Sequence, residues 1–317
     1  MLTPLQQKLA LELIRFQDSE DTIYTIAGYA GSGKTYTLQY FINNYVKTKI
    51  AVSAYTHKAV DNISKVLSVP SHTIHSLLGL APNMNLDTFN PNNPSFTLQF
   101  EEKIGGYRIL VVDESSQIGD ALYSYLISRA KRHNVKIIFV GDPCQLPPIN
   151  EVLSNVFKVK NIFWLTEIIR QGKDNPILNI LNALRNDIYN NGSTAMNMLH
   201  SNPEVINDLG EGYTVLDNNA FELQLDNFIS NHKVISPDDF RFTAFTRNAV
   251  DTMNIKIHKL HYKDVEGANQ INKNDLLTAH KTIVDNYLTP IIINSLDYIV
   301  HDVIEFTTSD GIIVFAV

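Results

Sequence analysis

A glycine-rich octapeptide near the N-terminus carries the residues best suited to chemistry. Residues 28–35 read GYAGSGKT, in which a glycine and four further residues precede Gly33, Lys34 and Thr35. Such glycines let backbone N–H groups turn inward around a chain of phosphates, and a following helix N-terminus adds partial positive charge. Lys34 would then reach the β- and γ-phosphates of a nucleotide, and the Thr35 hydroxyl would hold Mg²⁺. The candidate nucleotide-binding residues of this loop are Gly28, Ala30, Gly31, Ser32, Gly33, Lys34, Thr35 and Tyr36.

The residues on either side place this loop between a strand and a helix. Residues 22–26 are β-branched and apolar, as in a buried strand, and residues 36–42 can continue as a helix. A chance glycine-rich turn is the alternative, but it would not require the lysine, the hydroxyl and both flanking elements. The pattern therefore predicts a P-loop.

A pair of acidic residues follows another apolar run. Residues 109–112 read ILVV and end in Asp113 and Glu114. Beside a P-loop, Asp113 would hold Mg²⁺, usually through water, and Glu114 would orient and deprotonate an attacking water molecule. A solvated strand end is the alternative reading of an isolated Asp-Glu pair.

A third motif, GDPCQLPP at residues 141–148, ends the next apolar run. The Gln145 amide can bond a phosphate oxygen and a neighbouring loop at once, which suits a sensor of the nucleotide state. A proline-rich turn leaving the sheet is the alternative.

The elements around these motifs predict an α/β fold. Apolar runs at residues 50–54, 109–112 and 136–140 alternate with helical patterns at 58–67 and 122–133. Continuously apolar strands separated by helices indicate a parallel sheet covered on both faces. Ligands of such sheets bind at the carboxyl ends of the strands, where all three motifs lie.

The remaining chain is less regular. Residues 81–103 are rich in Asn and Pro and predict a small β-hairpin with strands at 86–89 and 95–100; a surface loop is the alternative. Further on we expect helices at 177–184, 193–209 and 248–260, a strand at 242–246 and a β-meander at 298–317.

Composition limits the class of protein. The 317 residues suffice for two domains, 44% of them are hydrophobic, and no apolar run is long enough to span a bilayer. The N-terminus lacks the pattern of a signal peptide, and Cys144 is the only cysteine, so we expect no internal disulfide and a cytoplasmic location. A net charge of −7 argues against a generally basic nucleic-acid surface, although a local groove can still bind single strands.

Taken together, the motifs resemble those of superfamily 1 helicases, most of all the 5′→3′ Dda and RecD branch. The P-loop, DESSQ at 113–117, GDPCQLPP at 141–148 and LTEIIRQ at 165–171 occur in the order of that family. Four further segments match the branch: LTPLQ at 2–6, YTHKA at 55–59, HTIHSLL at 72–78 and FTRNAVD at 245–251.

The resemblance implies a RecA-like fold, cofactors and partners. It implies a first RecA-like domain at residues 1–174, with the hairpin insertion at about 82–104, and a partial second RecA-like domain at 175–317 with the start of a β-rich insertion. It further implies ATP hydrolysis with Mg²⁺, and single-stranded and fork DNA as partners, with no membrane association. Protein partners do not follow from it.

The resemblance also assigns residues. Gln6 would read adenine, and Arg170 would contact the γ-phosphate as an arginine finger does. Phe96 or Phe89 of the insertion could stack on a base at the fork. The DNA-contact candidates are Thr56, His57, Lys58, Thr73, His75, Phe96, Thr246 and Arg247.

Two late motifs of the second domain are not found. Residues 278–282, TAHKT, resemble one of them superficially but lack its Gln-Gly and follow Phe245 too closely. We therefore expect an N-terminal portion of a longer helicase or a divergent member. Two further hypotheses stay open: a nucleotide-dependent module that binds single-stranded DNA without turnover, and an RNA helicase of the viral superfamily 1 type.

Overall fold

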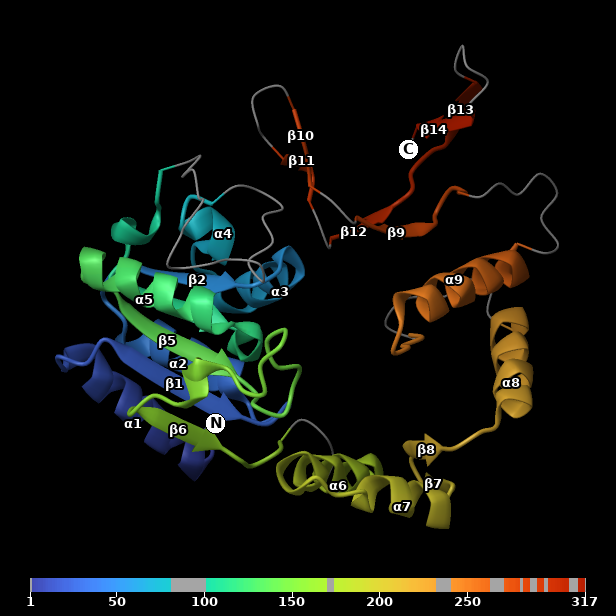
Figure 1. Cartoon of the computed structure of the whole chain (residues 1–317), viewed down its shortest axis with the longest axis horizontal. Coiled ribbons are helices and arrows are strands. Elements are labelled where there is room, and N and C mark those ends of the chain that lie inside the picture. The colour runs from blue at the N-terminus through green and yellow to red at the C-terminus, as the bar shows by residue number, and fades with distance from the viewer. Residues whose placement is uncertain are drawn as a thin grey trace. The chain divides into compact units, whose positions relative to one another are not determined.

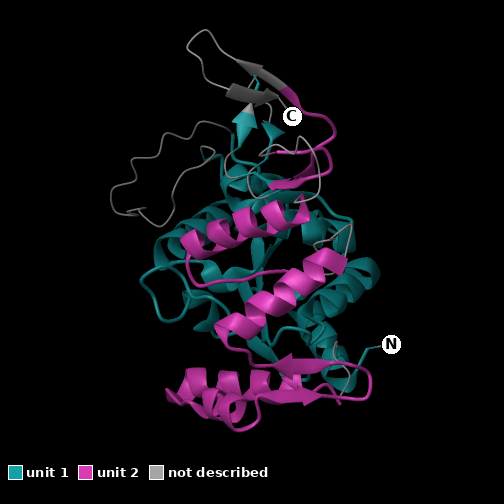
Figure 2. Cartoon of the chain, turned by 90° about the vertical axis from the view of Figure 1, so that its right-hand side faces the viewer, with its two compact units in different colours: residues 1–173, 278–297 teal, residues 174–277, 298–317 magenta. Residues whose placement is uncertain are grey.

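The chain forms two compact units. Unit 1 contains residues 1–173 and 278–297, and unit 2 contains residues 174–277 and 298–317 (Figure 2). The computed structural model describes residues 2–80, 101–169, 174–231, 241–262, 271–279, 282–285, 290–293, 296–307 and 313–316. The division into a first RecA-like domain at residues 1–174 and a partial second one at 175–317 stays a prediction.

Unit 1 is built on a parallel sheet of six strands in the order β3-β2-β4-β5-β1-β6 (Figure 1). The strands are β1 (Ile23–Gly28), β2 (Ile50–Ala54), β3 (Ser71–Thr73), β4 (Ile109–Asp113), β5 (Lys136–Gly141) and β6 (Ile162–Leu165). Every pairing between neighbouring strands is parallel. The predicted parallel α/β architecture is confirmed.

The helices of unit 1 lie on both faces of this sheet. They are α1 (Pro4–Asp18), α2 (Lys34–Tyr45), α3 (His57–Leu67), α4 (Ile74–Leu77) and α5 (Asp120–His133), with single 3₁₀ turns η2 (Ile104–Gly106), η3 (Ser115–Gln117) and η4 (Asn155–Phe157). Successive side chains of a strand point to opposite faces. In β4, Leu110 and Val112 therefore pack with α4 and α5, whereas Ile109 and Val111 pack with α1, α2 and α3.

The first helix is fixed at both ends by local polar contacts. Thr3 and Gln6 form a capping box, and Pro4 occupies the first turn, where a missing N–H costs nothing. At the other end, the Lys136 ammonium from β5 donates to the backbone carbonyls of Phe16, Ser19 and Asp21. A charge on one strand thus adds a donor to carbonyls at the helix end and in the following loop, of which the Phe16 carbonyl also accepts from Ser19.

Unit 2 consists of helices and short strands. Its helices are α6 (Ile177–Asn190), α7 (Thr194–Ser201), α8 (Asn218–Asn231) and α9 (Arg247–His261), and β7 (Glu204–Ile206) pairs with β8 (Gly212–Thr214) in an antiparallel manner. Near the C-terminus, β13 (Ile304–Thr307) pairs with β14 (Ile313–Ala316), also antiparallel. The remaining short strands of the chain are β9 (Leu276–Thr278), β10 (Ile283–Val284), β11 (Pro290–Ile292) and β12 (Asp297–Ile299).

Two predictions for unit 2 are wrong. The helix expected over residues 193–209 ends at Ser201, because Pro203 can neither donate a helical hydrogen bond nor tolerate a helical residue before it. The strand expected at 242–246 is irregular backbone, since none of the described strands pairs with it. Both strands of the hairpin predicted in the insertion lie outside the described residues.

No helix among the described residues is long and apolar enough to cross a membrane.

We predict that Lys136→Met lowers the free energy of unfolding of unit 1 by about 1–3 kcal/mol, because it removes a charged donor from three carbonyls. Urea denaturation followed by circular dichroism measures this. Lys160→Met changes an exposed lysine in the same unit and should leave stability unchanged. Equal midpoints for the two variants would contradict the prediction.

Candidate nucleotide-binding site

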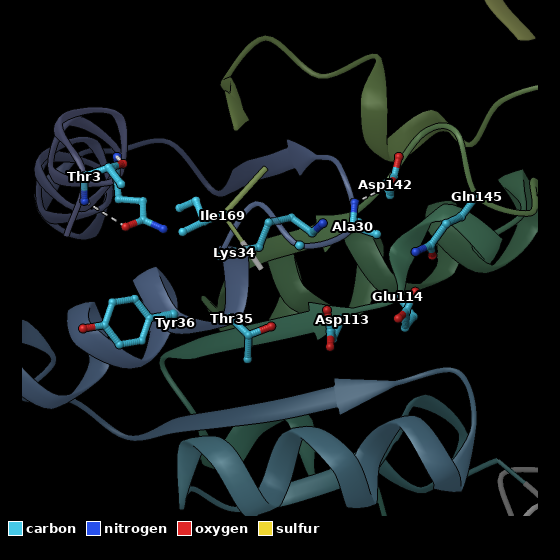
Figure 3. Close-up of a pocket in the computed structure, with 14 residues that line it drawn as sticks. Thr3, Ala30, Lys34, Thr35, Tyr36, Asp113, Glu114, Asp142, Gln145 and Ile169 are labelled. Atoms are coloured by element: carbon cyan, nitrogen blue, oxygen red, sulfur yellow. Dashed lines mark hydrogen bonds between the residues drawn. The ribbon is translucent and has the colours of Figure 1, made fainter. Parts of the chain in front are cut away.

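The motifs predicted to handle phosphate meet at one edge of the sheet. The strands β4, β5 and β1 are neighbours, so their carboxyl ends bring Asp113, Gly141 and the loop after Gly28 together. A cavity of about 410 Å³ lies at this edge (Figure 3). Its lining contains Thr3, Gln6, Ala30, Gly31, Gly33, Lys34, Thr35, Tyr36, Asp113, Glu114, Gly141, Asp142, Gln145 and Ile169.

Two glycines of the loop are required by its backbone and packing. Gly33 adopts φ +81°, and a Cβ there would lie 2.3 Å from the Gln6 amide nitrogen. A Cβ on Gly28 would lie 2.5 Å from the Leu165 carbonyl oxygen, where β1 runs beside β6. The loop can therefore turn at this point only with glycine in both positions.

Polar groups of the loop are arranged for an anion. The Lys34 ammonium donates to the carbonyls of Gly28, at 2.7 Å, and Tyr29, at 3.0 Å, which holds the positive charge over the loop. Ser32 is 1% exposed, and its hydroxyl has no hydrogen-bond partner among the described residues. A buried hydroxyl without a partner is costly unless a ligand supplies one, so the loop fits a phosphate chain.

The two carboxylates lie at the end of β4. Glu114 adopts the left-handed conformation at φ +50° and turns the chain into η3. Burial is the largest cause that raises the pKa of the Asp113 carboxyl to about 6, and the charge of Glu114 is the second. The Glu114 backbone N–H and the charge of Lys34 lower this pKa by smaller amounts. A cation beside Asp113 would relieve both causes of this shift.

The donor set fits Mg²⁺. The Thr35 hydroxyl and the Asp113 carboxylate face the same space in the cavity (Figure 3). The described part of the chain holds no group of three or more His, Cys, Asp or Glu side chains that could form a metal cage. Mg²⁺ commonly binds through one or two protein groups, with water and substrate phosphates completing its octahedron, which agrees with this sparse set.

Sequence reasoning did not select Asp142 as a site residue, although it lies at the centre of the hydrogen bonding. It is 3% exposed, and its carboxylate accepts from the backbone N–H groups of Ala30 and Cys144, both at 2.9 Å. The first bond joins the loop after β5 to the P-loop, and the second shapes the loop that carries Gln145. Asp142 is visible in the sequence as the second residue of the GDPCQLPP motif. Its hydrogen-bond partner Ala30 is 112 positions away, so the sequence does not show the contact.

The other end of the cavity is lined by residues from three segments. The Gln6 amide is 2% exposed; its oxygen accepts from Thr3 N–H at 3.0 Å and its nitrogen donates to the Ser32 carbonyl at 3.3 Å. Tyr36 at the start of α2 and Ile169 complete this end, and Ile169 N–H donates to Gly31 at 2.9 Å. Thr3 and Ile169 were not predicted as site residues.

The predicted DNA-contact residues of unit 1 that the structure describes lie at the N-terminal ends of α3 and α4. The hydroxyls of Thr56 and Thr73 cap these helices by accepting from Ala59 and Ser76, both at 3.2 Å. Burial, and next the charge of His75, lower the pKa of His57. His75 stacks edge-on against Tyr55 at a ring distance of 6.4 Å.

Lys58 forms an ion pair with Asp297, whose other carboxylate oxygen accepts from the Thr278 hydroxyl at 2.8 Å. Thr246 and Arg247 lie in unit 2, where the Thr246 hydroxyl caps α9 by accepting from Ala249 at 3.3 Å. Arg170, Phe89 and Phe96 lie outside the described residues.

The fold and site define a P-loop NTPase. A family model described as an AAA domain matches residues 1–206, and the chain belongs to that family. Within it, the relatives place the chain with superfamily 1B helicases of the Dda, RecD and Pif1 type, which confirms the resemblance seen in the motifs.

Two curated relatives and one solved structure illustrate this. An uncharacterized protein of Acanthamoeba polyphaga mimivirus is 30% identical over 233 residues, covering 61% of this chain and 46% of the relative. The ATP-dependent DNA helicase Dda of Enterobacteria phage T4 is 29% identical over 253 residues, covering 74% of this chain and 52% of Dda. Pif1 helicase from Bacteroides in complex with ADP-AlF3 and ssDNA has a similar fold, with a TM-score of 0.55 and 21% identity over 99% of this chain and 74% of that one. The chain thus spans about half the length of these two curated relatives.

We predict that Asp142→Asn weakens binding of MgATP about tenfold. The Asp142 carboxylate accepts from two N–H groups, but an asparagine side chain has only one oxygen, and its NH2 group would face the other N–H. Loss of one charged hydrogen bond is worth about 1.5–3 kcal/mol. Fluorescence titration with a labelled ATP analogue measures the change. Asp18→Asn, at an exposed site on α1, is the matched control. Indistinguishable affinities for the two variants would show that the bond to Ala30 does not order the loop.

Proposed function

We propose that this chain contains the ATP-hydrolysing motor of a DNA helicase that moves 5′→3′ on single-stranded DNA. The observation that supports it most is the convergence of Lys34, Thr35, Asp113 and Glu114 on one cavity. A phosphate cradle facing two fixed carboxylates is what metal-assisted hydrolysis of a nucleoside triphosphate needs. The polarity follows from the resemblance to the Dda and RecD branch, and we propose action on DNA in the cytoplasm.

In this proposal each residue has one task. The P-loop amides and Lys34 bind the phosphates, and Thr35 and Asp113 hold Mg²⁺, which when bound withdraws charge from the phosphate oxygens. Glu114 accepts a proton from the attacking water, whose oxygen bonds to the γ-phosphorus while the bond from that phosphorus to the β,γ-bridging oxygen breaks. Gln145 senses the γ-phosphate, and Arg170 stabilises the charge that develops on it.

The site for DNA in this proposal consists of a few placed groups. The net charge of −7 argues against a broadly basic surface that would attract a polyanion. Thr56, His57, Lys58, Thr73 and His75 of unit 1 would contact the strand. Thr246 and Arg247 of unit 2 would do the same, and Phe96 would stack at the fork. Contacts to backbone and base faces carry little sequence information, so we expect low sequence specificity.

Steady-state ATPase measurements with and without single-stranded DNA test this function. We expect DNA-stimulated turnover that falls about 100-fold or more in Lys34→Ala, the usual scale for loss of one group that stabilises transition-state charge. Lys47→Ala removes an exposed lysine just after α2 and serves as the control.

The parent rate in Lys34→Ala would refute the assignment. ATP binding without stimulated turnover would instead favour the non-cycling DNA-binding module, and equal or better stimulation by RNA would favour the viral type of RNA helicase.

The ion pair of Lys58 yields a second prediction. Asp297 occupies the ammonium that we propose contacts a DNA phosphate, so the phosphate must compete with a carboxylate. Asp297→Asn should therefore tighten binding of a single-stranded oligonucleotide a few-fold at low salt, with a smaller gain at high salt. Fluorescence anisotropy at two salt concentrations measures this.

Asp61→Asn is the matched control for that experiment. It removes one negative charge from α3, the helix that carries Lys58, but it frees Lys65, at 2.7 Å from Asp61, instead of Lys58. An equal gain in both variants would mean that net charge alone, and not release of Lys58, controls the affinity.

A further inference from the structure

A partly buried ionic cluster lies outside the nucleotide site, at the base of the insertion. The Glu102 side chain is 8% exposed, and its carboxylate pairs with Arg129 and with His133 Nε2, the latter at 3.2 Å. Arg129 and His133 are four residues apart and so lie on one face of α5. No motif of the sequence contains these three residues.

The neighbours of the cluster fix its geometry. The Arg129 guanidinium lies over the Tyr125 ring, 5.5 Å from its centroid. Gly105 packs against the His133 imidazole so closely that a Cβ would lie 2.8 Å from Nδ1. The backbone just after Glu102 is therefore set against α5 by a charge contact on one side and a close packing contact on the other.

The two ends of the inserted segment also return to one short helix. Before it, Leu80 N–H donates to the His75 carbonyl at 2.9 Å; after it, Lys103 N–H donates to the Leu77 carbonyl at 3.0 Å. Leu80 and Ile104 are both buried in the core cluster beneath α5. The described residues on either side of positions 81–100 are thus both held at α4 and in the core beneath α5.

Burial of an ion pair is not explained by stability alone. Desolvation of the charges offsets much of their attraction, and an apolar group of similar shape is often as stable. What such a pair adds is a defined direction, because a carboxylate held between the Arg129 guanidinium and the His133 ring has one favoured position. α5 is itself packed on the sheet through Leu122 and Leu126, so the direction is set relative to the motor core.

We propose that Glu102 is a positioning residue that aligns the inserted segment with the motor, so that strand separation depends on it while translocation does not. This rests on the proposed function, in which residues 81–100 meet the fork. Force at the fork would pass through the base of the insertion to α5 and α4. A base free to pivot would let the motor advance without opening the duplex.

The test compares Glu102→Gln with Glu101→Gln, its exposed neighbour, in the full 317-residue chain. We expect Glu102→Gln to lower unwinding of a 5′-tailed fork at least five-fold, with single-strand-stimulated ATPase and translocation within two-fold of the parent. Glu101→Gln should change neither. His133→Asn removes the second partner of Glu102. It should also lower unwinding while leaving ATPase and translocation unchanged, but the loss of unwinding should be smaller.

A second measurement is independent of helicase activity. Amide hydrogen exchange at Lys103 should quicken at least ten-fold in Glu102→Gln, with the amides of β4 and β5 unchanged. Unchanged exchange at Lys103, or parallel loss of unwinding and ATPase, would overturn the positioning role. If the parent shows no DNA-stimulated ATPase, the proposed function fails, and exchange at Lys103 alone decides whether Glu102 holds the base.

Discussion

The structure of unit 1 depends on the parallel pairing of β1 between β5 and β6. This pairing buries β1 on both faces and leaves only its carboxyl end open, so the chain after Gly28 must turn at the sheet edge. The close approach of Gly28 to the Leu165 carbonyl leaves no room for a side chain there. Because all strands run the same way, the ends of β4 and β5 deliver their acidic residues to the same place.

Charge in the site is organised around this edge. The Asp142 carboxylate accepts hydrogen bonds from two backbone N–H groups, and one of these bonds fixes the position of the P-loop. Asp113 accepts from the Glu114 backbone N–H, but burial, followed by the charge of Glu114, raises its pKa to about 6. Two aspartates at the ends of neighbouring strands thus differ in role: the buried Asp142 shapes a loop, and the half-buried Asp113 is poised to accept a cation.

Ionic contacts outside the site connect segments that are distant in sequence. Glu102 ties the base of the insertion to α5, and Asp297 pairs with Lys58 at the start of α3. The first is largely buried, so water competes little with it, whereas the second is partly exposed and open to competition from a phosphate or from salt. In the function that we propose, the buried pair would transmit force and the exposed pair would respond to DNA.

The sequence by itself determined the parallel α/β class, the P-loop and the acidic pair, because each is written in contiguous residues with a clear period or spacing. It missed β3 and β6, which are too short for a periodic pattern, and it extended α7 past Pro203. Only the tertiary structure decided that Asp142 meets Ala30, that Glu102 meets Arg129 and that Lys58 meets Asp297. Those contacts join residues that strand order and helix packing bring together. Strand order and helix packing cannot be read from the residues adjacent in sequence to each contact.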